Sequence, residues 1–200
     1  MHHLFCGIPI EVLAEHPFET TKGNQRTFKT GGLGWDQLDT ESKVHFLPCM
    51  GSFVGSDLLA GAIAQNIHLS KEPCLLVDLG TNGEILIGNR ERMLCASTAA
   101  GPAFEGAKIS MGMRASSGAI SKINGHEGTL ECHVLGGGEA RGLCGSGLVD
   151  AVAVCLDQKR ILPNGRVPGN KEIPLSGMVN LNPLDIRELQ LAKGAIAAGI

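Results

Sequence analysis

Residues 78–84 read Asp-Leu-Gly-Thr-Asn-Gly-Glu, and they decide the fold expected for this 200-residue chain. Apolar runs at 74–77 and 85–87 flank them, so the pattern predicts a strand, a tight glycine and asparagine turn, and a second strand. Such a turn can offer several backbone N–H groups to a phosphate while the carboxylate of Asp78 holds a hydrated Mg²⁺. The stretch therefore points to ATP.

The same turn also has a plainer interpretation, because Asn-Gly is the favoured pair of a type I′ hairpin. The carboxylates of Asp78 and Glu84 repel each other unless a cation lies between them, which favours the ligand-binding interpretation. We expect Asp78 to position Mg²⁺ through water and Glu84 to orient the attacking water. The backbone groups expected to hold phosphate belong to Gly80, Thr81, Asn82 and Gly83.

Segment 142–147 is a second candidate loop and reads Gly-Leu-Cys-Gly-Ser-Gly. It is predicted to open a helix that runs to about Asp157, so Gly145, Ser146 and Gly147 can bind an anion through free N–H groups. A close helix–strand contact that needs no ligand explains the glycines equally well. The segment completes no P-loop, dinucleotide-binding or esterase motif.

Segment 99–106 is the third candidate loop and reads Ala-Ala-Gly-Pro-Ala-Phe-Glu-Gly. Gly101 and Glu105 are its candidate ligand-contacting residues. Glu105 can equally be an ordinary cap for a short helix.

Charge and composition exclude several classes of protein. The formal charge is −3, from 17 basic and 20 acidic residues without a Lys/Arg cluster, so we expect no nucleic-acid partner. No stretch approaches the roughly 20 apolar residues of a membrane span. Seven scattered cysteines without a Cys-x-x-Cys pair indicate reduced thiols in a cytoplasmic protein and no iron–sulfur site in this chain.

The chain is expected to be α/β, with a domain boundary at the polar break 69–73. Residues 1–50 are expected to be irregular apart from a strand at 43–47. Short loops force neighbouring strands to be antiparallel, which predicts a meander followed by a hairpin. The expected strands are 74–79, 84–88, 92–97, 118–124 and 129–135. The expected helices are 58–67, the helix ending at 157, and 183–200, with Asn182 as its N-cap and Pro183 in the first turn.

Together these motifs resemble the reductive activators of corrinoid proteins, which are ATPases of the acetate and sugar kinase/Hsc70/actin superfamily. The resemblance implies a partial actin-like (ribonuclease H-like) fold with a mixed sheet and packed helices. Residues 1–70 would be the later part of the first such domain, and residues 73–200 the larger part of the second. The matching segments are 1–4, 53–57, 78–84, 99–106, 112–115, 142–150 and 189–193.

The resemblance further implies ATP-dependent reduction of a corrinoid cobalt from Co(II) to Co(I). The electron would come from an iron–sulfur domain, and the partner would be a corrinoid (iron–sulfur) protein or a corrinoid-dependent methyltransferase. The family also suggests a homodimer. The chain lacks the iron–sulfur domain, the first domain's phosphate hairpin and the glycine pair expected over adenosine. We therefore expect an interior fragment, and we assign the function to the longer protein.

Two alternatives remain open. A small-molecule kinase of the same superfamily would phosphorylate an acceptor, whereas an activator yields phosphate and reduced cobalt. A non-catalytic docking module would bind a corrinoid protein whether or not ATP is present, and its glycine loops would serve only the structure.

Overall fold

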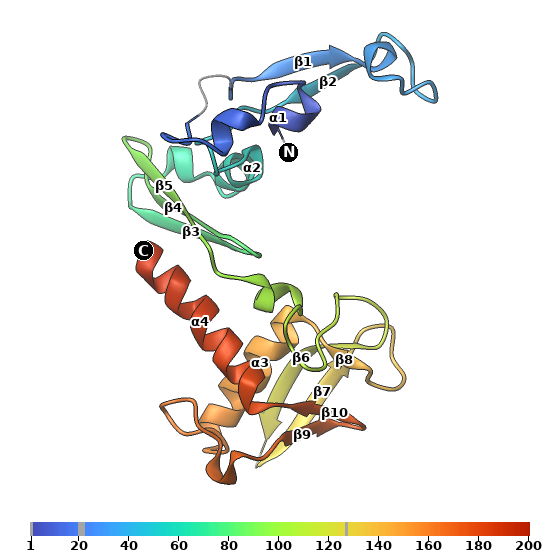
Figure 1. Ribbon diagram of the computed structural model, residues 1–200, viewed down its shortest axis with the longest axis vertical. Helices are drawn as coiled ribbons and strands as arrows, with labels where there is room; N and C mark the ends of the chain where they lie inside the picture. The colour runs from blue at the N-terminus through green and yellow to red at the C-terminus, as the bar shows by residue number, and fades with distance from the viewer. Residues whose placement is uncertain (1, 20–22, 127) are drawn as a thin grey trace. The chain divides into compact units, whose positions relative to one another are not determined.

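A computed structural model of the chain describes residues 2–19, 23–126 and 128–200. Met1, the first residue of the matching segment 1–4, lies outside them. The chain forms two compact units, of which the first comprises residues 1–78 and 84–97 and the second residues 79–83 and 98–200. The predicted meander is therefore divided between the units: its turn at residues 79–83 belongs to the second unit, and most of its strands belong to the first. Figure 1 shows the order of the elements along the chain.

Among the described residues, the first unit contains two short α-helices and most of five strands, besides 3-10 turns. Its helices are α1 (His2–Phe5) and α2 (Ser56–Ala64), and its strands are β1 (Arg26–Lys29), β2 (Lys43–Phe46), β3 (Cys74–Leu79), β4 (Gly83–Gly88) and β5 (Met93–Thr98).

In the part of the second unit that the structure describes there are five strands and two longer α-helices, besides 3-10 turns. Its strands are β6 (Ala119–His126), β7 (Thr129–Val134), β8 (Gly142–Leu143), β9 (Ile173–Ser176) and β10 (Val179–Leu181), and its helices are α3 (Gly145–Asp157) and α4 (Pro183–Gly199). No helix among the residues described in the two units is long and apolar enough to cross a membrane.

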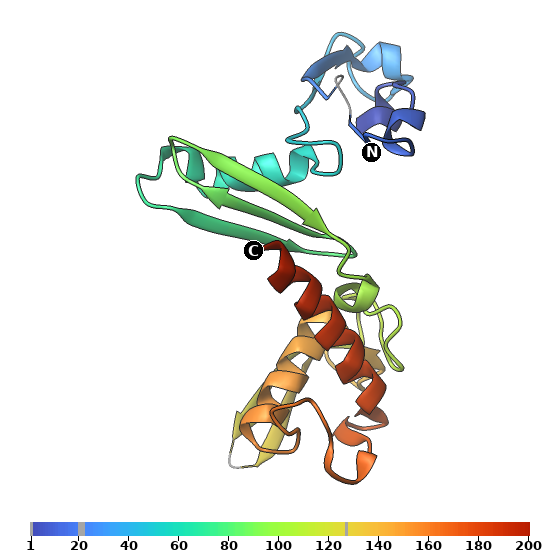
Figure 2. The same cartoon turned by 60° about the vertical axis from the view of Figure 1, so that its left-hand side comes forward.

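Strands β3, β4 and β5 form the predicted meander, hydrogen-bonded in that order. Each differs from its predicted bounds by no more than a residue, and the strand directions alternate in Figure 2. Helix α2 covers one face of this sheet, because its Leu58 and Ala62 are buried in one cluster with Leu86 of β4. Burial of these apolar side chains stabilises this part of the first unit.

The expectation that residues 1–50 are irregular apart from a strand at 43–47 missed β1 and α1, although most of the described residues in this range lie outside helices and strands. β1 pairs antiparallel with the expected strand β2, from Arg26 opposite Phe46 to Lys29 opposite Lys43. Phe5 of α1 stacks on Phe46 with ring centroids 4.7 Å apart and meets Phe28 edge-on at 5.7 Å. A four-residue strand whose partner lies beyond a long loop carries too little local pattern for detection from sequence.

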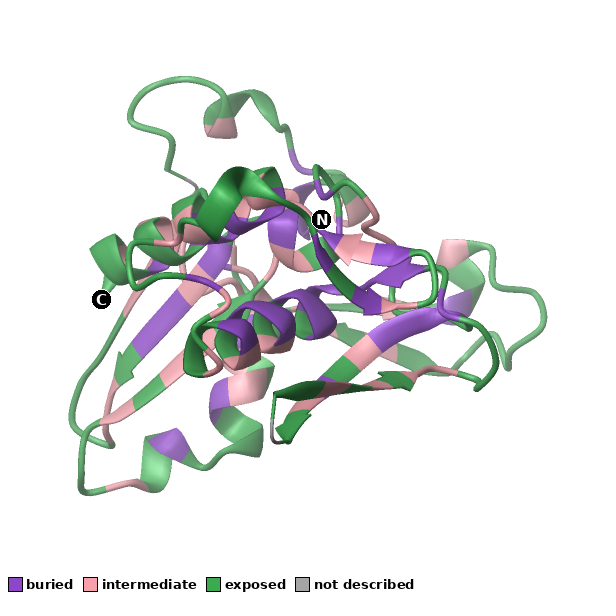
Figure 3. Ribbon diagram, turned by 90° about the horizontal axis from the view of Figure 1, so that it is seen from below, coloured by how far each residue is buried: buried purple, intermediate pink, exposed green. Residues whose placement is uncertain are grey.

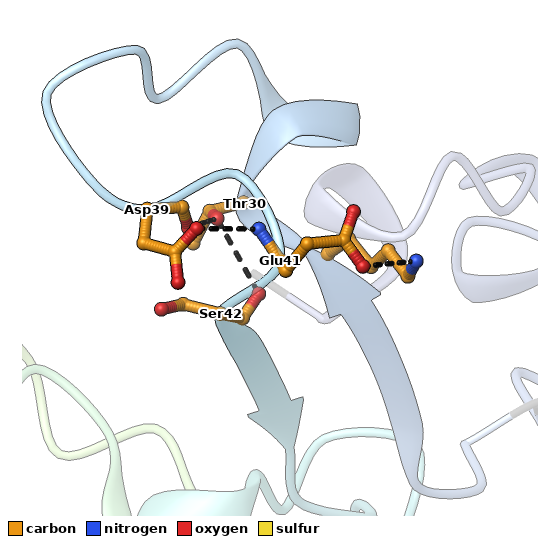
Figure 4. Close-up of polar contacts among 5 residues, drawn as sticks. Thr30, Asp39, Glu41 and Ser42 are labelled. Atoms are coloured by element: carbon orange, nitrogen blue, oxygen red, sulfur yellow. Dashed lines mark hydrogen bonds and ion pairs between the residues drawn. The ribbon is translucent and has the colours of Figure 1, made fainter.

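Thr30 anchors the loop between β1 and β2 (Figure 4). Its hydroxyl is buried and donates to the carbonyl oxygens of Asp39 and Ser42, while its N–H also donates to Ser42 O at 3.0 Å. The Glu41 N–H donates to the Asp39 carboxylate at 3.2 Å, and the Glu41 carboxylate forms an ion pair with Lys29 Nζ at 2.6 Å. The loop is therefore fixed at its base by one residue with all its polar groups bonded.

The second unit is built on a mixed sheet of order β7-β6-β8. β6 pairs antiparallel with β7 and parallel with β8, where Ile120 lies opposite Leu143. Helix α3 packs on β6 and presents a buried stripe visible in Figure 3, which comprises Gly145, Gly147, Leu148, Ala151, Val152 and Cys155. The predicted mixed sheet with packed helices is confirmed.

Helix α4 begins as predicted, with Asn182 as the N-cap and Pro183 in the first turn. Asn182 and Asp185 form a capping box. The Asn182 side chain accepts from backbone N–H groups of the first helical turn, and the Asp185 carboxylate accepts from the N–H of Asn182. Asp185 is fully buried and also accepts from the N–H and the hydroxyl of Ser110, both at 2.7 Å. This carboxylate therefore ties the start of α4 to the 107–112 loop.

Candidate functional site

The turn 80–82 and the segment 99–106 meet at Thr81. The Thr81 hydroxyl donates to Glu105 Oε2 at 2.7 Å, and its N–H donates to Glu105 Oε1 at 3.3 Å. The Thr81 carbonyl in turn accepts from the N–H of Gly101 at 2.8 Å. Two of the three sequence motifs are therefore joined by three hydrogen bonds. Sequence reasoning singled out both motifs but did not link them.

The backbone on both sides of Glu105 is closely packed against other parts of the second unit. It ends a short 3-10 helix, Pro102–Glu105, and Gly106 follows in the left-handed conformation with φ 76°. A Cβ at Gly106 would lie 2.6 Å from Met113 O, and a Cβ at Gly145 would lie 1.7 Å from Phe104 O. Backbone therefore touches backbone on both sides of Glu105, which fixes where its side chain starts.

The third motif packs its glycines tightly. Besides Gly145 against Phe104, a Cβ at Gly147 would lie 2.1 Å from Ile120 O of β6. The hydroxyl of Ser146 donates to Ser121 O at 2.8 Å. These contacts favour the interpretation in which the glycines serve a close helix–strand contact.

A cavity of about 440 Å³ lies beside this helix start in the second unit. Its lining comprises Phe104, Glu105, Met113, Arg114, Ala115, Cys144, Gly145 and Ser146. Arg114 is exposed and forms no ion pair with the residues that the structure describes. The first turn of α3 contributes its positive helix end beside Arg114, while Glu105 contributes a carboxylate to the same lining.

The two carboxylates of the hairpin have different surroundings. Asp78 is exposed at the end of β3, whereas Glu84 in β4 is half-buried and accepts a hydrogen bond from the Ser97 hydroxyl at 3.3 Å. Gly83 follows the turn, and a Cβ there would lie 1.8 Å from Ile196 Cδ1 of α4. A side chain at Gly83 would therefore require the end of the Ile196 side chain to move.

Glu84 also lines a cavity of about 460 Å³ in the first unit, together with His2, His3 and Asp57. Both histidines are buried, and His3 Nδ1 lies 2.9 Å from Pro9 O. Among the described residues, neither ring nitrogen of His2 has a hydrogen-bond partner. Burial lowers the pKa of His2 below its usual value, the charges of His3 and Arg26 act in the same direction, and the backbone of Leu47 acts weakly in the opposite one. Sequence reasoning did not place these residues near Glu84. The one sequence feature that could have drawn attention to them is the unusual pair His2-His3.

A cation at the hairpin would depend on few protein ligands. No cluster of three or more His, Cys, Asp and Glu side chains in the described part of the chain is arranged to hold a metal. Mg²⁺ keeps several of its waters and is often held by one or two carboxylates together with substrate phosphates. An exposed carboxylate at a strand end, as at Asp78, fits that mode of binding.

The architecture described above is that of an actin-like (ribonuclease H-like) α/β fold. Residues 72–200 match the family described as the C-terminal domain of RACo, the ASKHA domain, and residues 1–70 match the RACo middle region. The chain therefore belongs to the RACo family of reductive activators of corrinoid proteins. An ASKHA domain implies a nucleotide site with a metal ion.

Three similar proteins place the chain within longer relatives. It is 34% identical over 189 residues to the corrinoid activation enzyme RamQ of Eubacterium limosum, a match that covers 81% of this chain and 32% of RamQ. It is 29% identical over 199 residues to the [Co(II) methylated amine-specific corrinoid protein] reductase of Methanosarcina barkeri, covering 88% of this chain and 37% of that protein.

A solved structure of a reductive activator for corrinoid, iron-sulfur protein matches with a TM-score of 0.85 and 30% identity. The match covers 100% of this chain and 35% of that one. The chain thus spans about a third of the length of each of these relatives.

Proposed function

We propose that this chain supplies the nucleotide-binding part of an activator that reduces the cobalt of a corrinoid protein from Co(II) to Co(I). The reduction would be driven by ATP, with the electron delivered by an iron–sulfur domain elsewhere in the longer protein. The observation that carries the proposal is the hairpin 78–84, with its glycine turn and its two carboxylates, in a chain that matches an ASKHA domain over residues 72–200. Membership of the RACo family supports the corrinoid protein, or a corrinoid-dependent methyltransferase, as the partner, with the protein acting as a homodimer.

In this proposal each hairpin residue has a separate task. The Gly80–Gly83 backbone holds phosphate, and Asp78 holds the water shell of Mg²⁺, which neutralises phosphate charge when bound. Glu84 orients the attacking water, and the Ser97 hydroxyl fixes the direction of its carboxylate. Gly101 supports the turn through Thr81. Residues 145–147 provide a second contact for phosphate at the start of α3.

The test is turnover by the longer protein that contains this chain. We expect Asp78→Ala and Glu84→Gln each to lower the rate of ATP hydrolysis by about 10²-fold or more. This is the usual rate loss when a group that orients water or stabilises charge is removed from an active site. Co(I) formation, followed by absorbance, should fall in parallel. Asp157→Asn, at the exposed C-terminal end of α3, is the matched control and should leave both rates unchanged. Normal turnover in both hairpin variants would exclude the proposed site.

A docking module is the second candidate, and the packing of the glycines favours it. Gly145 and Gly147 each lie against backbone and so have a structural reason to lack a side chain, and both Thr81 donors are already bonded within the protein. This candidate predicts capture of a corrinoid protein that neither ATP nor Asp78→Ala alters. A phosphorylated acceptor in place of free phosphate would instead indicate a kinase.

A further inference from the structure

Glu105 occupies the Thr81 N–H, which the proposed function assigns to phosphate, and the Thr81 hydroxyl beside it. Its two carboxylate oxygens accept from the hydroxyl and the N–H of Thr81, at 2.7 and 3.3 Å. A phosphate oxygen at the turn would accept from the same two donors, because carboxylates and phosphates are both oxyanions with similar hydrogen-bond geometry. Both anions cannot hold the Thr81 donors at once.

Charge adds to this geometric conflict. Two like charges within about 4 Å disfavour each other even in water, and a phosphate carries more than one charge. The backbone of Glu105 is held in place, because the backbone of Phe104 contacts Gly145 and the backbone of Gly106 contacts Met113. Phosphate binding therefore requires the Glu105 side chain, rather than its backbone, to move.

The neighbouring cavity offers a position for the displaced carboxylate. Glu105 and Arg114 line the same cavity of about 440 Å³, and the Arg114 guanidinium has no ion-pair partner within the described ranges. Both side chains are exposed, so a change of rotamer is not opposed by packing. An Arg–carboxylate pair would compensate Glu105 for the hydrogen bonds that it gives up.

We propose that Glu105 is an internal competitor of phosphate at Thr81 and thereby sets the nucleotide affinity of this site. With Thr81 free of phosphate, the carboxylate holds the turn in place. When phosphate binds, the carboxylate moves towards Arg114. This inference rests on the proposed function, and it makes Glu105 a positioning residue that acts through Thr81.

The experiment measures binding of Mg-pyrophosphate and Mg-ADP to the full 200-residue chain, by NMR titration of the backbone amides of residues 80–83. We expect Glu105→Gln to tighten binding about fivefold, which is the size of the repulsion between unit charges about 4 Å apart in water. The Thr81 amide should also exchange faster in this variant before ligand is added. Glu91→Gln removes the same charge at the exposed turn joining β4 and β5 and should change neither quantity.

A double-mutant cycle tests the second position of the carboxylate. Arg114→Gln should weaken binding when Glu105 is present, because the displaced carboxylate loses its partner. In the Glu105→Gln background the same change should have a clearly smaller effect. Equal effects of Arg114→Gln in both backgrounds would show that Arg114 binds the ligand itself, which contradicts the proposed movement.

Failure of this inference can be told from failure of the proposed function. Unchanged or weaker binding in Glu105→Gln, with binding by the unaltered chain intact, overturns the competition and leaves the nucleotide site standing. If neither ligand shifts the amides of residues 80–83 in any variant, both proposals fail for this chain.

Discussion

At the residue scale, Gly145 makes the tightest backbone contact near the candidate site. Any side chain there would meet the carbonyl of Phe104, which cannot turn aside as a flexible side chain can. We predict that Gly145→Ala lowers the free energy of unfolding of the second unit by about 1–3 kcal/mol, the usual cost of overpacking. Urea unfolding followed by far-UV circular dichroism measures the change.

Gly194→Ala is the matched control for this prediction. Gly194 lies in α4, and a Cβ there meets nothing within 4 Å. Alanine is the better helix former by about 0.8–1.0 kcal/mol, so this variant should gain stability. A Gly145→Ala protein as stable as the unaltered chain would mean that the 102–105 segment can move away from α3.

The same residues show what the sequence can and cannot predict about the site. The spacing of 142–147 marked a helix start, but it left a ligand and a packing contact as equal explanations. The positions of Phe104 beside Gly145 and of Ile120 beside Gly147 favour the second. Similarly, Thr81 and Glu105 are 24 positions apart, and nothing in the local pattern of either motif specifies that a carboxylate reaches across to a turn. Such contacts depend on tertiary packing, which is absent from local periodicity.

At the scale of elements, the packing of α2 on the meander predicts where the first unit is sensitive to truncation. Leu86 of β4 is completely buried in the cluster with Leu58, so Leu86→Ala should cost about 2–5 kcal/mol. Leu94→Ala in β5, where the side chain is 54% exposed, should cost much less. Fluorescence of Trp35, the single tryptophan, reports unfolding of the first unit. Equal losses in the two variants would contradict the packing of α2 on this face.

The elements predicted correctly share a strong local signal. The meander has alternating apolar runs and short turns, and α4 has an N-cap and proline at its start. β1, β8, β9 and β10 were not predicted, and each has four residues or fewer. Their pairing depends on partners elsewhere in the chain, such as β6 for β8, rather than on their own composition. Tertiary context decides such short strands.

At the scale of the whole molecule, the two units should respond differently to acid. His2 is buried in the first unit without a hydrogen-bond partner for either ring nitrogen within the described ranges, and its pKa is lowered by burial. In the unfolded chain an imidazole titrates near about 6.5, so below that pH the unfolded first unit binds a proton that the folded one resists. The contribution of neutral His2 to stability is therefore complete above about pH 6.5 and is lost as the pH falls below it.

We predict that the urea midpoint reported by Trp35 fluorescence falls between pH 7.5 and pH 5.5, and that His2→Leu reduces this fall. The second unit should lose less stability over the same range, because the buried His2 belongs to the first unit. His68→Gln alters an exposed histidine of the first unit and should leave the pH dependence as it is. An equal fall in the unaltered and His2→Leu proteins would show that acid destabilises the first unit through other groups.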